Sequence, residues 1–481
     1  VQDAQDWFGI DGELEIDGTV VPLAQIIQAL REGRRYVPVT GGMWVRISKL
    51  FQDRLREMGD LLQVDHGKLR IGPEAAPLLR EVVKETGLTK ACRAWEDFLE
   101  RFDRAMKIEP KPPRGFKAKF RPYQLEGYRW LSRLATWGVG GILADDMGLG
   151  KTVQALALLL DRAKEGPALV VAPTSVSSNW IAEAKRFAPK LRPVLYRETD
   201  RAAEPDEIKN GDLVVVSYAM AMRDVERLKK VKWGTLVLDE AQFVKNSQTK
   251  TAQAIRQIAA GWRVALTGTP IENHLGDLWS LFRAISPGLF GSWERFRERF
   301  AAPIERDHDP VRREALARLV RPFVLRRTKD EVLRDLPART EIRLDAELSP
   351  EERKLYDQAR LTALAKLVQK DPDEDQRFQV LAALTRLRQL ACHPKLVLPE
   401  TKATSAKLEL FLETVDELRD EGHRALVFSQ FTSLLALVRE ALDARGVKYQ
   451  YLDGSTPAGK RDAAISAFQG GSGDLFLISL K

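Results

Sequence analysis

Short runs of consecutive apolar residues alternate with helical patterns between residues 140 and 269. The apolar runs lie at 141–144, 169–172, 213–217, 236–238 and 264–266. Strands that are apolar on both faces and alternate with helices are typical of a parallel sheet that helices cover on both sides. The pattern therefore predicts an α/β fold for this part of the chain.

The hydrophobic pattern changes twice after residue 275. Strand signals fade up to about residue 402, and charged amphipathic helices are predicted there, for example at 351–368 and 378–390. Strand patterns then return with helical patterns between them, at 424–428, 432–445, 448–452, 459–468 and 475–479. This order predicts a second α/β lobe that begins near residue 403 and is not finished at residue 481.

The first hundred residues have a different pattern. Alternating strand-like stretches at 12–16, 36–39 and 44–47 surround a helical pattern at 23–30, and 74–102 is also helical in pattern. We expect five segments along the chain: an α+β and helical accessory region (1–105), a basic linker (106–120), a first lobe (121–290), helical insertions (291–402) and the start of a second lobe (403–481).

Composition narrows the class of protein without identifying it. The chain has 481 residues, of which 44% are hydrophobic and 30% charged, as in ordinary soluble proteins. No apolar run is long enough for a membrane span, and the first residues do not resemble a signal peptide. Two cysteines, Cys92 and Cys392, suggest neither a disulfide framework nor a metal site. We expect a cytoplasmic protein without a membrane partner.

Net charge points weakly to a polyanionic partner. Lys and Arg total 76 against 68 Asp and Glu, which gives a formal net charge of +8. Much of this excess lies in residues 107–121 (KIEPKPPRGFKAKFR), where six basic residues accompany Glu109 alone. Three prolines in this segment disfavour a continuous helix. Two interpretations remain open, a solvated linker and a strap that contacts phosphates.

A phosphate-binding loop is predicted directly after the strand at 141–144. It has the sequence Asp146-Met147-Gly148-Leu149-Gly150-Lys151-Thr152, and a helical pattern follows. A strand, a glycine-containing turn and a helix in that order direct backbone N–H groups towards an anion. Lys151 can then reach nucleotide phosphates, and the Thr152 hydroxyl can bind Mg²⁺. Asp145 stands where the strict motif has its first glycine.

A second candidate element is the apolar strand that ends in Asp239 and Glu240. An acid at the carboxyl end of a neighbouring strand is placed to bind the magnesium of a nucleotide, and Glu240 could deprotonate the attacking water. For this pair alone, an ordinary strand end with solvated acids would compete. The upstream loop favours the catalytic interpretation.

The series of motifs resembles the Swi/Snf family of double-stranded DNA translocases within helicase superfamily two. In that family an acid commonly replaces the first glycine of the phosphate loop, as Asp145 does here. The other matching segments are 121–124 (RPYQ), 172–174 (APT), 266–270 (LTGTP), 325–333 (LRRTKDEVL), 387–394 (LRQLACHP), 426–430 (LVFSQ) and 452–456 (LDGST). The resemblance implies two RecA-like lobes with helical insertions, preceded by an accessory region like that of bacterial members.

The resemblance also implies roles for individual residues. Arg121 and Gln124 would recognise adenine, and residues 146–152 would hold the triphosphate and Mg²⁺ together with Asp239. Glu240 and Gln242 would join Lys151 in catalysis. Thr267, Gly268 and Thr269 would couple nucleotide state to DNA contact, and six residues would line the DNA path: Pro173, Thr174, Ser217, Tyr218, Ser429 and Gln430.

Several of these residues have a second interpretation. For Tyr218 and Trp279 plain packing is favoured over a functional contact. His393 lies beside Cys392, but no second pair stands at a ligand spacing, so a metal site is rejected. Arg326, Arg327 and Lys329 could hold phosphates or helix acids, and the sequence favours neither.

We therefore expect an ATP- and Mg²⁺-dependent motor that moves along double-stranded DNA, acting as a monomer. The second lobe stops before the arginine motif that crosses the cleft in the family, so we expect this chain to bind ATP but to hydrolyse it poorly. An alternative is a catalytically weak module that binds DNA, RNA polymerase or another DNA-bound protein through residues 7–102. Strand separation is a third possibility, for which no wedge is visible.

Overall fold

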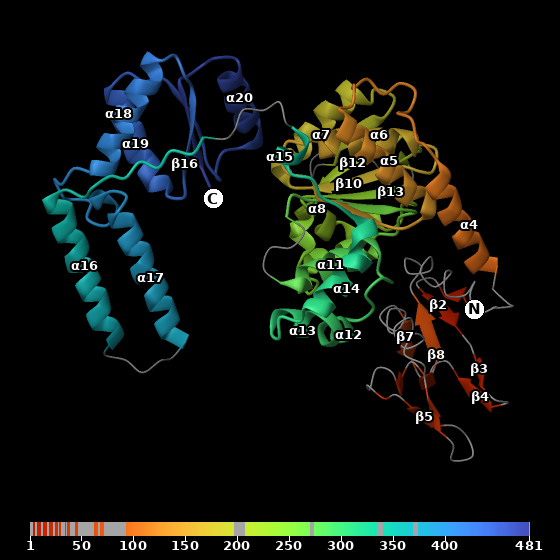
Figure 1. Cartoon of the computed structure of the whole chain (residues 1–481). Coiled ribbons are helices and arrows are strands. Elements are labelled where there is room, and N and C mark those ends of the chain that lie inside the picture. Colours follow the sequence, from red (N-terminus) through yellow and green to blue (C-terminus); the bar gives the residue numbers. More distant parts are fainter. Residues whose placement is uncertain are drawn as a thin grey trace. The chain divides into compact units, whose positions relative to one another are not determined.

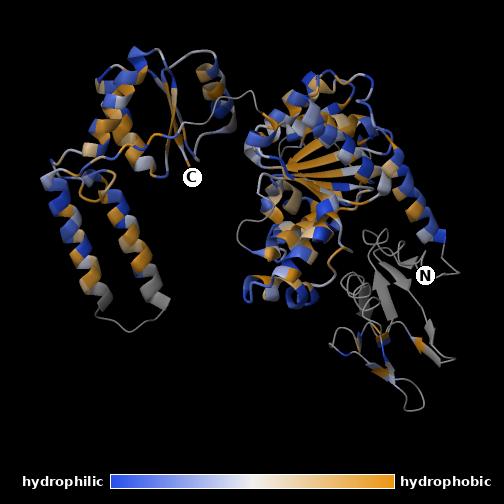
Figure 2. Cartoon of the chain, in the orientation of Figure 1, coloured by the Kyte–Doolittle hydropathy of each residue, from blue (hydrophilic) through white to orange (hydrophobic). Residues whose placement is uncertain are grey.

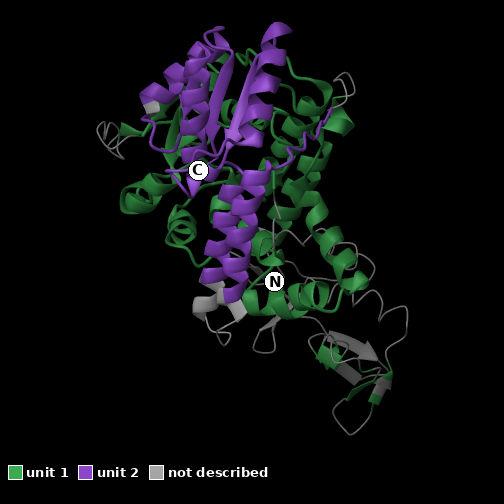
Figure 3. Cartoon of the chain, turned by 90° about the vertical axis from the view of Figure 1, so that its left-hand side faces the viewer, with its two compact units in different colours: residues 1–337 green, residues 338–481 purple. Residues whose placement is uncertain are grey.

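The computed structural model divides into two compact units, Val1–Pro337 and Ala338–Lys481 (Figures 1 and 3). The described residues are 93–480, except 197–206, 270–273, 334–339 and 369–373, together with short segments between 3 and 71. The boundaries of the five segments expected from sequence stay predictions.

Most of the amino-terminal residues that the structure describes form antiparallel strands, and residues 25–26 and 28–29, within the helix expected at 23–30, are helical. Four of the strands form one sheet in the order β1-β2-β8-β7, and two hairpins pair β3 with β4 and β5 with β6. Their bounds are β1 Asp3–Ala4, β2 Trp7–Ile10, β3 Glu13–Ile16, β4 Thr19–Pro22, β5 Tyr36–Pro38, β6 Trp44–Arg46, β7 Leu62–Asp65 and β8 Lys68–Ile71. The strands expected near 12–16, 36–39 and 44–47 are confirmed. Of the helix expected at 74–102, residues 74–92 lie outside the described part.

A seven-stranded parallel sheet forms the centre of the first unit, in the order β11-β12-β10-β13-β14-β9-β15. Its strands are β9 Gly141–Leu143, β10 Ala168–Ala172, β11 Arg192–Leu195, β12 Asp212–Ser217, β13 Thr235–Asp239, β14 Arg263–Leu266 and β15 Val324–Leu325. The five strands expected from the apolar runs are confirmed. The two edge strands were not expected, because β11 contains a proline and is only partly buried, and β15 has two residues.

Burial explains why the sequences of the inner strands are continuous apolar runs. Every residue of β10 and β13 is buried, and the sheet is the most hydrophobic layer of the unit (Figure 2). In Figure 1, α5, α6 and α7 lie on one side of this sheet, and α8 and α11 lie on the other. The first set and the helix before it are α4 Arg93–Lys107, α5 Pro122–Trp137, α6 Lys151–Asp161 and α7 Thr174–Phe187. Gly138, with φ of 94°, ends α5.

Short helices complete the first unit. They are α8 Tyr218–Arg223, α9 Val225–Leu228, η3 Ala241–Val244, α10 Lys250–Gln257, α11 Leu275–Ile285, α12 Trp293–Phe296, η4 Arg297–Ala301, α13 Ala302–Glu305, α14 Pro310–Val320, η5 Arg321–Phe323 and α15 Lys329–Val332. The helical character expected after residue 275 is confirmed. The strand β15 corrects that expectation at one point, because it returns from the helices to pair with β9.

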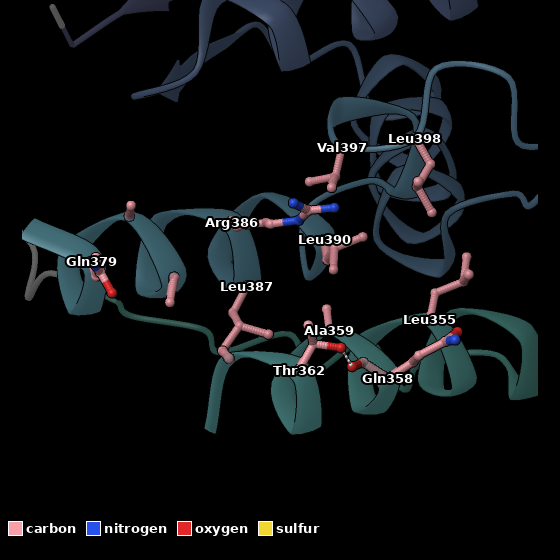
Figure 4. A pocket seen from close by; sticks show the side chains of 13 residues that line it. Leu355, Gln358, Ala359, Thr362, Gln379, Arg386, Leu387, Leu390, Val397 and Leu398 are labelled. Atoms are coloured by element: carbon pink, nitrogen blue, oxygen red, sulfur yellow. Dashed lines mark hydrogen bonds between the residues drawn. The ribbon is translucent and has the colours of Figure 1, made fainter. Parts of the chain in front are cut away.

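The second unit has a three-stranded parallel sheet in the order β16-β18-β17. Its elements are α16 Pro350–Val368, α17 Glu374–Leu390, η6 Pro394–Leu396, α18 Ala406–Asp420, β16 Ala425–Ser429, α19 Thr432–Ala444, β17 Tyr449–Leu452, α20 Ala458–Gln469 and β18 Leu475–Ser479. The elements expected from 351 onward are therefore confirmed. Helices α16 and α17 lie side by side, and a pocket between them is lined by Leu355, Leu387 and Leu398 among others (Figure 4).

No helix in the described part of the chain is long and apolar enough to cross a membrane. In both units, the parallel sheets with helical connections confirm the expected α/β class.

Candidate nucleotide site and nucleic-acid contacts

Two glycines shape the loop between β9 and α6. Gly148 and Gly150 have φ of 88° and 80°, a left-handed conformation that glycine adopts without steric cost. Gly150 is also the residue that precedes the first turn of α6, and a Cβ on it would lie 2.5 Å from Nε2 of Gln124. The loop therefore brings the free amides of a helix start to the carboxyl edge of the sheet, where an anion can bind.

Gln124 contacts this loop directly. Its Nε2 donates to the carbonyl of Leu149 at 3.2 Å, and its Oε1 accepts from the backbone N–H of Arg121 at 3.0 Å. The start of α5 and the phosphate loop are thus held together. The two residues expected to recognise adenine lie next to the residues expected to hold phosphates.

Lys151 lies within reach of the acidic strand end. Its Nζ donates to the carbonyl of Asp145 at 2.7 Å, and the side chain is buried. Burial lowers the pKa of Lys151, and the negative charges of Glu240, Asp145 and Asp239 act in the opposite direction. The lysine and the two acids therefore share one electrostatic environment, as the sequence predicts.

Asp239 is held by three hydrogen bonds at the end of β13. Nε1 of Trp180 donates to Oδ2 at 2.7 Å, the N–H of Glu240 donates to Oδ1 at 3.0 Å, and the Tyr218 hydroxyl donates to the Asp239 carbonyl at 2.8 Å. Burial raises the pKa of Asp239, while the bond from Trp180 lowers it. Glu240 has φ of 48°, a costly left-handed conformation for a residue with a side chain.

A chain of polar contacts leads from Glu240 to the end of β14. Nε2 of Gln242 donates to Oε2 of Glu240 at 2.9 Å, and the Thr267 hydroxyl donates to Oε1 of Gln242 at 3.1 Å. The N–H of Thr269 then donates to the Thr267 hydroxyl at 3.1 Å. A Cβ on Gly268 would lie 3.6 Å from Cγ of Met147, so the expected coupling residues border the phosphate loop.

Asp145 and Arg327 form a buried ion pair that sequence reasoning did not assign. Nε and Nη2 of Arg327 donate to Oδ1 and Oδ2 of Asp145 at 2.9 and 2.5 Å, and Nη2 also donates to Oε1 of Gln154 at 3.1 Å. Nη1 donates to the Tyr123 carbonyl. Asp145 is 0% exposed and Arg327 9%. The acid in place of the first loop glycine is thus neutralised by an arginine 182 residues away.

Arg326, Arg327 and Lys329, which could hold phosphates or acids by sequence, have three different surroundings in the structure. Arg327 holds a loop acid, whereas the Arg326 side chain is exposed. The backbone N–H of Lys329 donates to Oδ2 of Asp146 at 3.1 Å. Its Nζ lies 3.8 Å from the position that a Cβ on Gly148 would take, so the ammonium group is next to the phosphate loop. The available sequence signal was the acid at position 145, because an acid beside a buried strand needs a cation as its partner.

Three of the residues expected to contact DNA lie at adjacent strand ends. Pro173 precedes the first turn of α7, Thr174 begins that helix, and Ser217 accepts a hydrogen bond from the N–H of Met220 at the start of α8. Because Ala172 pairs with Ser217, the two helix starts are neighbours. Their amides and hydroxyls suit phosphate oxygens and read no bases.

Tyr218 and Trp279 have the packing roles that the sequence favoured. The buried Tyr218 ring stacks on Phe243 with centroids 5.1 Å apart, and its hydroxyl holds the Asp239 backbone. A contact of Tyr218 with DNA stays a prediction. Trp279 is buried and donates from Nε1 to the Gly291 carbonyl at 3.1 Å.

Ser429 and Gln430 lie in the second unit at the end of β16. The Ser429 hydroxyl accepts from the N–H of Phe431 at 3.1 Å, and Oε1 of Gln430 accepts from Nη2 of Arg388 at 2.8 Å. In the same unit, Nδ1 of the buried His393 accepts from the N–H of Lys395. No group of three or more metal-ligating side chains occurs among the described residues.

The first-unit site fits a magnesium-bound nucleotide. The glycine-shaped cradle suits phosphates, Lys151 supplies a cation, and Thr152 and Asp239 offer oxygen ligands of the kind that Mg²⁺ prefers. Each carboxylate oxygen of Asp239 accepts one hydrogen bond, Oδ2 from the Trp180 side chain and Oδ1 from the N–H of Glu240. Each oxygen can accept more than one bond, so the carboxylate can still bind a metal ion.

Comparison with known proteins agrees with these motifs. Residues 123–396 match the SNF2-related domain, and residues 406–481 match the helicase conserved C-terminal domain. A Bacillus subtilis protein, YwqA, named as a candidate ATP-dependent helicase/translocase, is 38% identical over 394 residues, which cover 78% of this chain and 42% of YwqA. The Arabidopsis thaliana ISWI chromatin-remodeling complex ATPase CHR17 is 34% identical over 395 residues, which cover 77% of this chain and 36% of CHR17.

A solved structure is also similar. The Sulfolobus solfataricus SWI2/SNF2 ATPase core in complex with dsDNA is 35% identical, with 77% of this chain and 80% of that chain covered and a TM-score of 0.46. The present chain spans less than half the length of the curated relatives named above.

Proposed function

The chain belongs to the SNF2 family of helicase-like ATPases, and from this premise we propose that it is the ATP-hydrolysing part of a motor that moves along double-stranded DNA. One observation carries the proposal. Lys151, Asp239 and Glu240 act on one another electrostatically beside a glycine-shaped phosphate cradle.

The nucleotide would bind across this edge of the sheet. Gln124, with Arg121, would recognise adenine, and the amides of residues 147–152 with Lys151 would hold the β- and γ-phosphates. Thr152 and Asp239 would hold Mg²⁺, which supplies charge neutralisation at the phosphates when bound. Glu240 would orient and deprotonate the attacking water, and the Gln242 amide bonded to it fixes its side chain.

DNA would be gripped by its phosphates. The helix starts at Thr174 and Ser217 offer amides and hydroxyls in the first unit, and Ser429 and Gln430 offer them in the second. The polar chain from Glu240 through Gln242 to Thr267 would pass nucleotide state towards this surface. Alternating affinity for DNA between nucleotide states converts hydrolysis into steps.

Nucleotide binding tests the first half of the proposal without depending on turnover. A fluorescent ATP analogue should bind the 481-residue chain in Mg²⁺, and Lys151→Ala should weaken binding at least about tenfold, since it removes a buried charged partner of the phosphates. Lys190→Ala, an exposed lysine of the same unit, is the control. Equal affinities for the two variants would contradict the site.

DNA tracking needs a separate test, the dependence of ATP hydrolysis on the length of the DNA duplex. ATP hydrolysis should increase with duplex length until the motor no longer reaches the end before dissociating. Identical stimulation by short and long duplexes would leave DNA binding in place but remove support for tracking.

Binding of RNA polymerase through residues 7–102 and a monomeric state stay predictions. Only parts of that amino-terminal region belong to the described residues. A pull-down with the 481-residue chain tests the first, and light scattering tests the second.

A further inference from the structure

Residues 107–121, the basic strap, connect α4 to α5 along a fixed course. The Tyr128 hydroxyl donates to the Lys111 carbonyl at 3.1 Å, and Nε of Arg129 donates to the Pro110 carbonyl at 3.3 Å. Further on, the N–H of Lys117 donates to the Phe187 carbonyl at 2.8 Å. The strap is therefore tied at several points to α5 and to the end of α7, unlike a free linker.

The strap has an apolar inner side. The rings of Phe116 and Phe120 are 5.1 Å apart, and Phe120 stacks on the buried Tyr128 at 5.8 Å. Both phenylalanines pack against the main hydrophobic core. This packing fixes which side of the strap faces outward.

The outer side is almost entirely cationic. Its six basic side chains are all exposed, and no ion pair joins any of them to another described residue. They are Lys107, Lys111, Arg114, Lys117, Lys119 and Arg121. Glu109 is the one acid within the strap, and no large hydrophobic side chain of residues 107–121 is exposed.

Three cations from another element extend this surface. Lys185 and Arg186 lie in the last turn of α7, Lys190 follows it, and all three are exposed. A Cβ on Gly115 would lie 2.7 Å from Cε of Lys190, so the lysine stem runs against the strap. Arg186 lies over the ring of Phe187, whose carbonyl receives the strap N–H. Charges distant in sequence therefore gather on one surface.

We propose that the strap cations from Lys107 to Lys119, together with Lys185, Arg186 and Lys190, bind the phosphate backbone of double-stranded DNA, at a place distinct from the helix starts at Thr174 and Ser217. Double-stranded DNA is a polyanion with closely spaced charges, and neutralising them releases counterions. Protein partners are usually anchored by buried aromatic and apolar side chains, which this outer side lacks. The surface would bind without sequence preference, and it deepens the proposed function by adding a contact.

The ordered backbone makes this surface effective. A cationic segment that is already fixed loses little conformational entropy when it binds, whereas a flexible linker would lose much more. The strap cations lie on long side chains that can adjust to the spacing of phosphates without moving the backbone.

The test is the salt dependence of DNA binding by the 481-residue chain. Anisotropy of a labelled duplex is measured between 50 and 200 mM NaCl for wild type and for the triple variant Lys111→Gln, Arg114→Gln, Lys117→Gln. If each of the three contacts one phosphate, the slope of log K against log salt should become shallower by about 2.7. None of the three residues belongs to the nucleotide site, so binding of the fluorescent ATP analogue should be unchanged.

A matched variant removes three exposed charges elsewhere in the same unit: Lys230→Gln, Arg306→Gln, Arg313→Gln. It has the same net charge, so a general electrostatic effect would alter both variants alike. Equal slopes for the two variants overturn the proposal and leave a solvated linker. Binding of polyglutamate that is lost in the strap variant, with unchanged DNA binding, overturns it in favour of an acidic protein partner. A wild-type chain that binds no duplex overturns the proposed function as well.

Discussion

Strands β10 and β16 have similar sequences but different places in their sheets, because β10 lies inside the sheet of the first unit and β16 at an edge of the sheet of the second. In the first unit, β10 (ALVVA) is buried at every position. In the second, β16 (ALVFS) alternates between partly buried and exposed residues, and Leu426 and Phe428 are 53% and 54% exposed. An apolar run therefore predicts a strand in both units, but burial depends on what covers each face of the sheet.

The same contrast extends to the helices and to the sites. The pair α16 and α17 exposes Leu361, Leu364, Leu381 and Leu384, and none of them is among the residues that line the pocket of Figure 4. In the first unit, the charged pair of Asp145 and Arg327 is buried. The candidate site of the first unit thus contains a buried ion pair, whereas the ion pairs among the described residues of the second unit are exposed.

The largest expected difference concerns ion pairs. Arg327→Met would leave the Asp145 carboxylate buried without its partner, which costs about 3–5 kcal/mol, whereas adding Asp145→Leu should recover much of the loss. In the second unit, Arg445 pairs with Asp416 at 2.5 Å, but their side chains are 42% and 48% exposed. Arg445→Gln should therefore cost less than about 1 kcal/mol.

Urea unfolding can follow the units separately. All 10 tryptophans precede residue 294, so tryptophan fluorescence reports the first unit, and circular dichroism reports both. Arg327→Met should shift the fluorescence transition, and Arg445→Gln should leave it unchanged. A double variant no more stable than Arg327→Met would show that Arg327 acts through Gln154 and the Tyr123 carbonyl instead of through Asp145.

Two helical glycines give the next contrast. A Cβ on Gly127 in α5 would lie 1.8 Å from Oε1 of Gln154 and 2.7 Å from Nη2 of Arg327, so Gly127→Ala should cost about 1–3 kcal/mol by overpacking. Gly459 in α20 has nothing within 4 Å of such a Cβ. Gly459→Ala should stabilise the second unit by up to about 1 kcal/mol, because alanine favours a helix. The same urea titrations measure both, and a tolerated Gly127→Ala would mean that the Arg327 network can shift without cost.

The sequence predicted the elements of the site better than the contacts that support it. The phosphate loop, the acid pair and the family were identified from local motifs, and the family is confirmed. The partner of Asp145 was not identified, because Arg327 follows a two-residue edge strand that has no clear pattern, and the pairing spans 182 residues. Local periodicity carries no information about such a distant pairing.

Where the sequence left two interpretations of a residue or segment, the fold supplied the contacts that bear on them. The hydrogen bond from Trp180 to Asp239 joins residues 59 positions apart, so it depends on the fold and not on a local pattern. For residues 107–121 the sequence allowed both a solvated linker and a strap that contacts phosphates, because it shows the charges of this segment but not the contacts that hold it. The anchoring carbonyls at Pro110 and Lys111 belong to no motif.

The smallest expected effect is on the pH dependence of stability, to which Asp239 in the first unit and Asp453 in the second contribute with opposite signs. Burial raises the pKa of Asp239, so in the first unit this group favours folding at low pH and loses that contribution as pH rises through its elevated pKa. Hydrogen bonds from Ser455 and Tyr451 lower the pKa of Asp453 to about 2, so its contribution is present above the ordinary Asp range and is lost as pH falls.

At neutral pH, Asp239→Asn should therefore raise the urea midpoint of the fluorescence transition while weakening Mg²⁺-dependent nucleotide binding. Asp453→Asn should slightly lower the midpoint of the remaining dichroism transition and leave nucleotide binding intact. If Asp239→Asn instead lowered the fluorescence midpoint, the bond from Trp180 would outweigh burial, and the acid would serve the fold of the first unit as well as its chemistry.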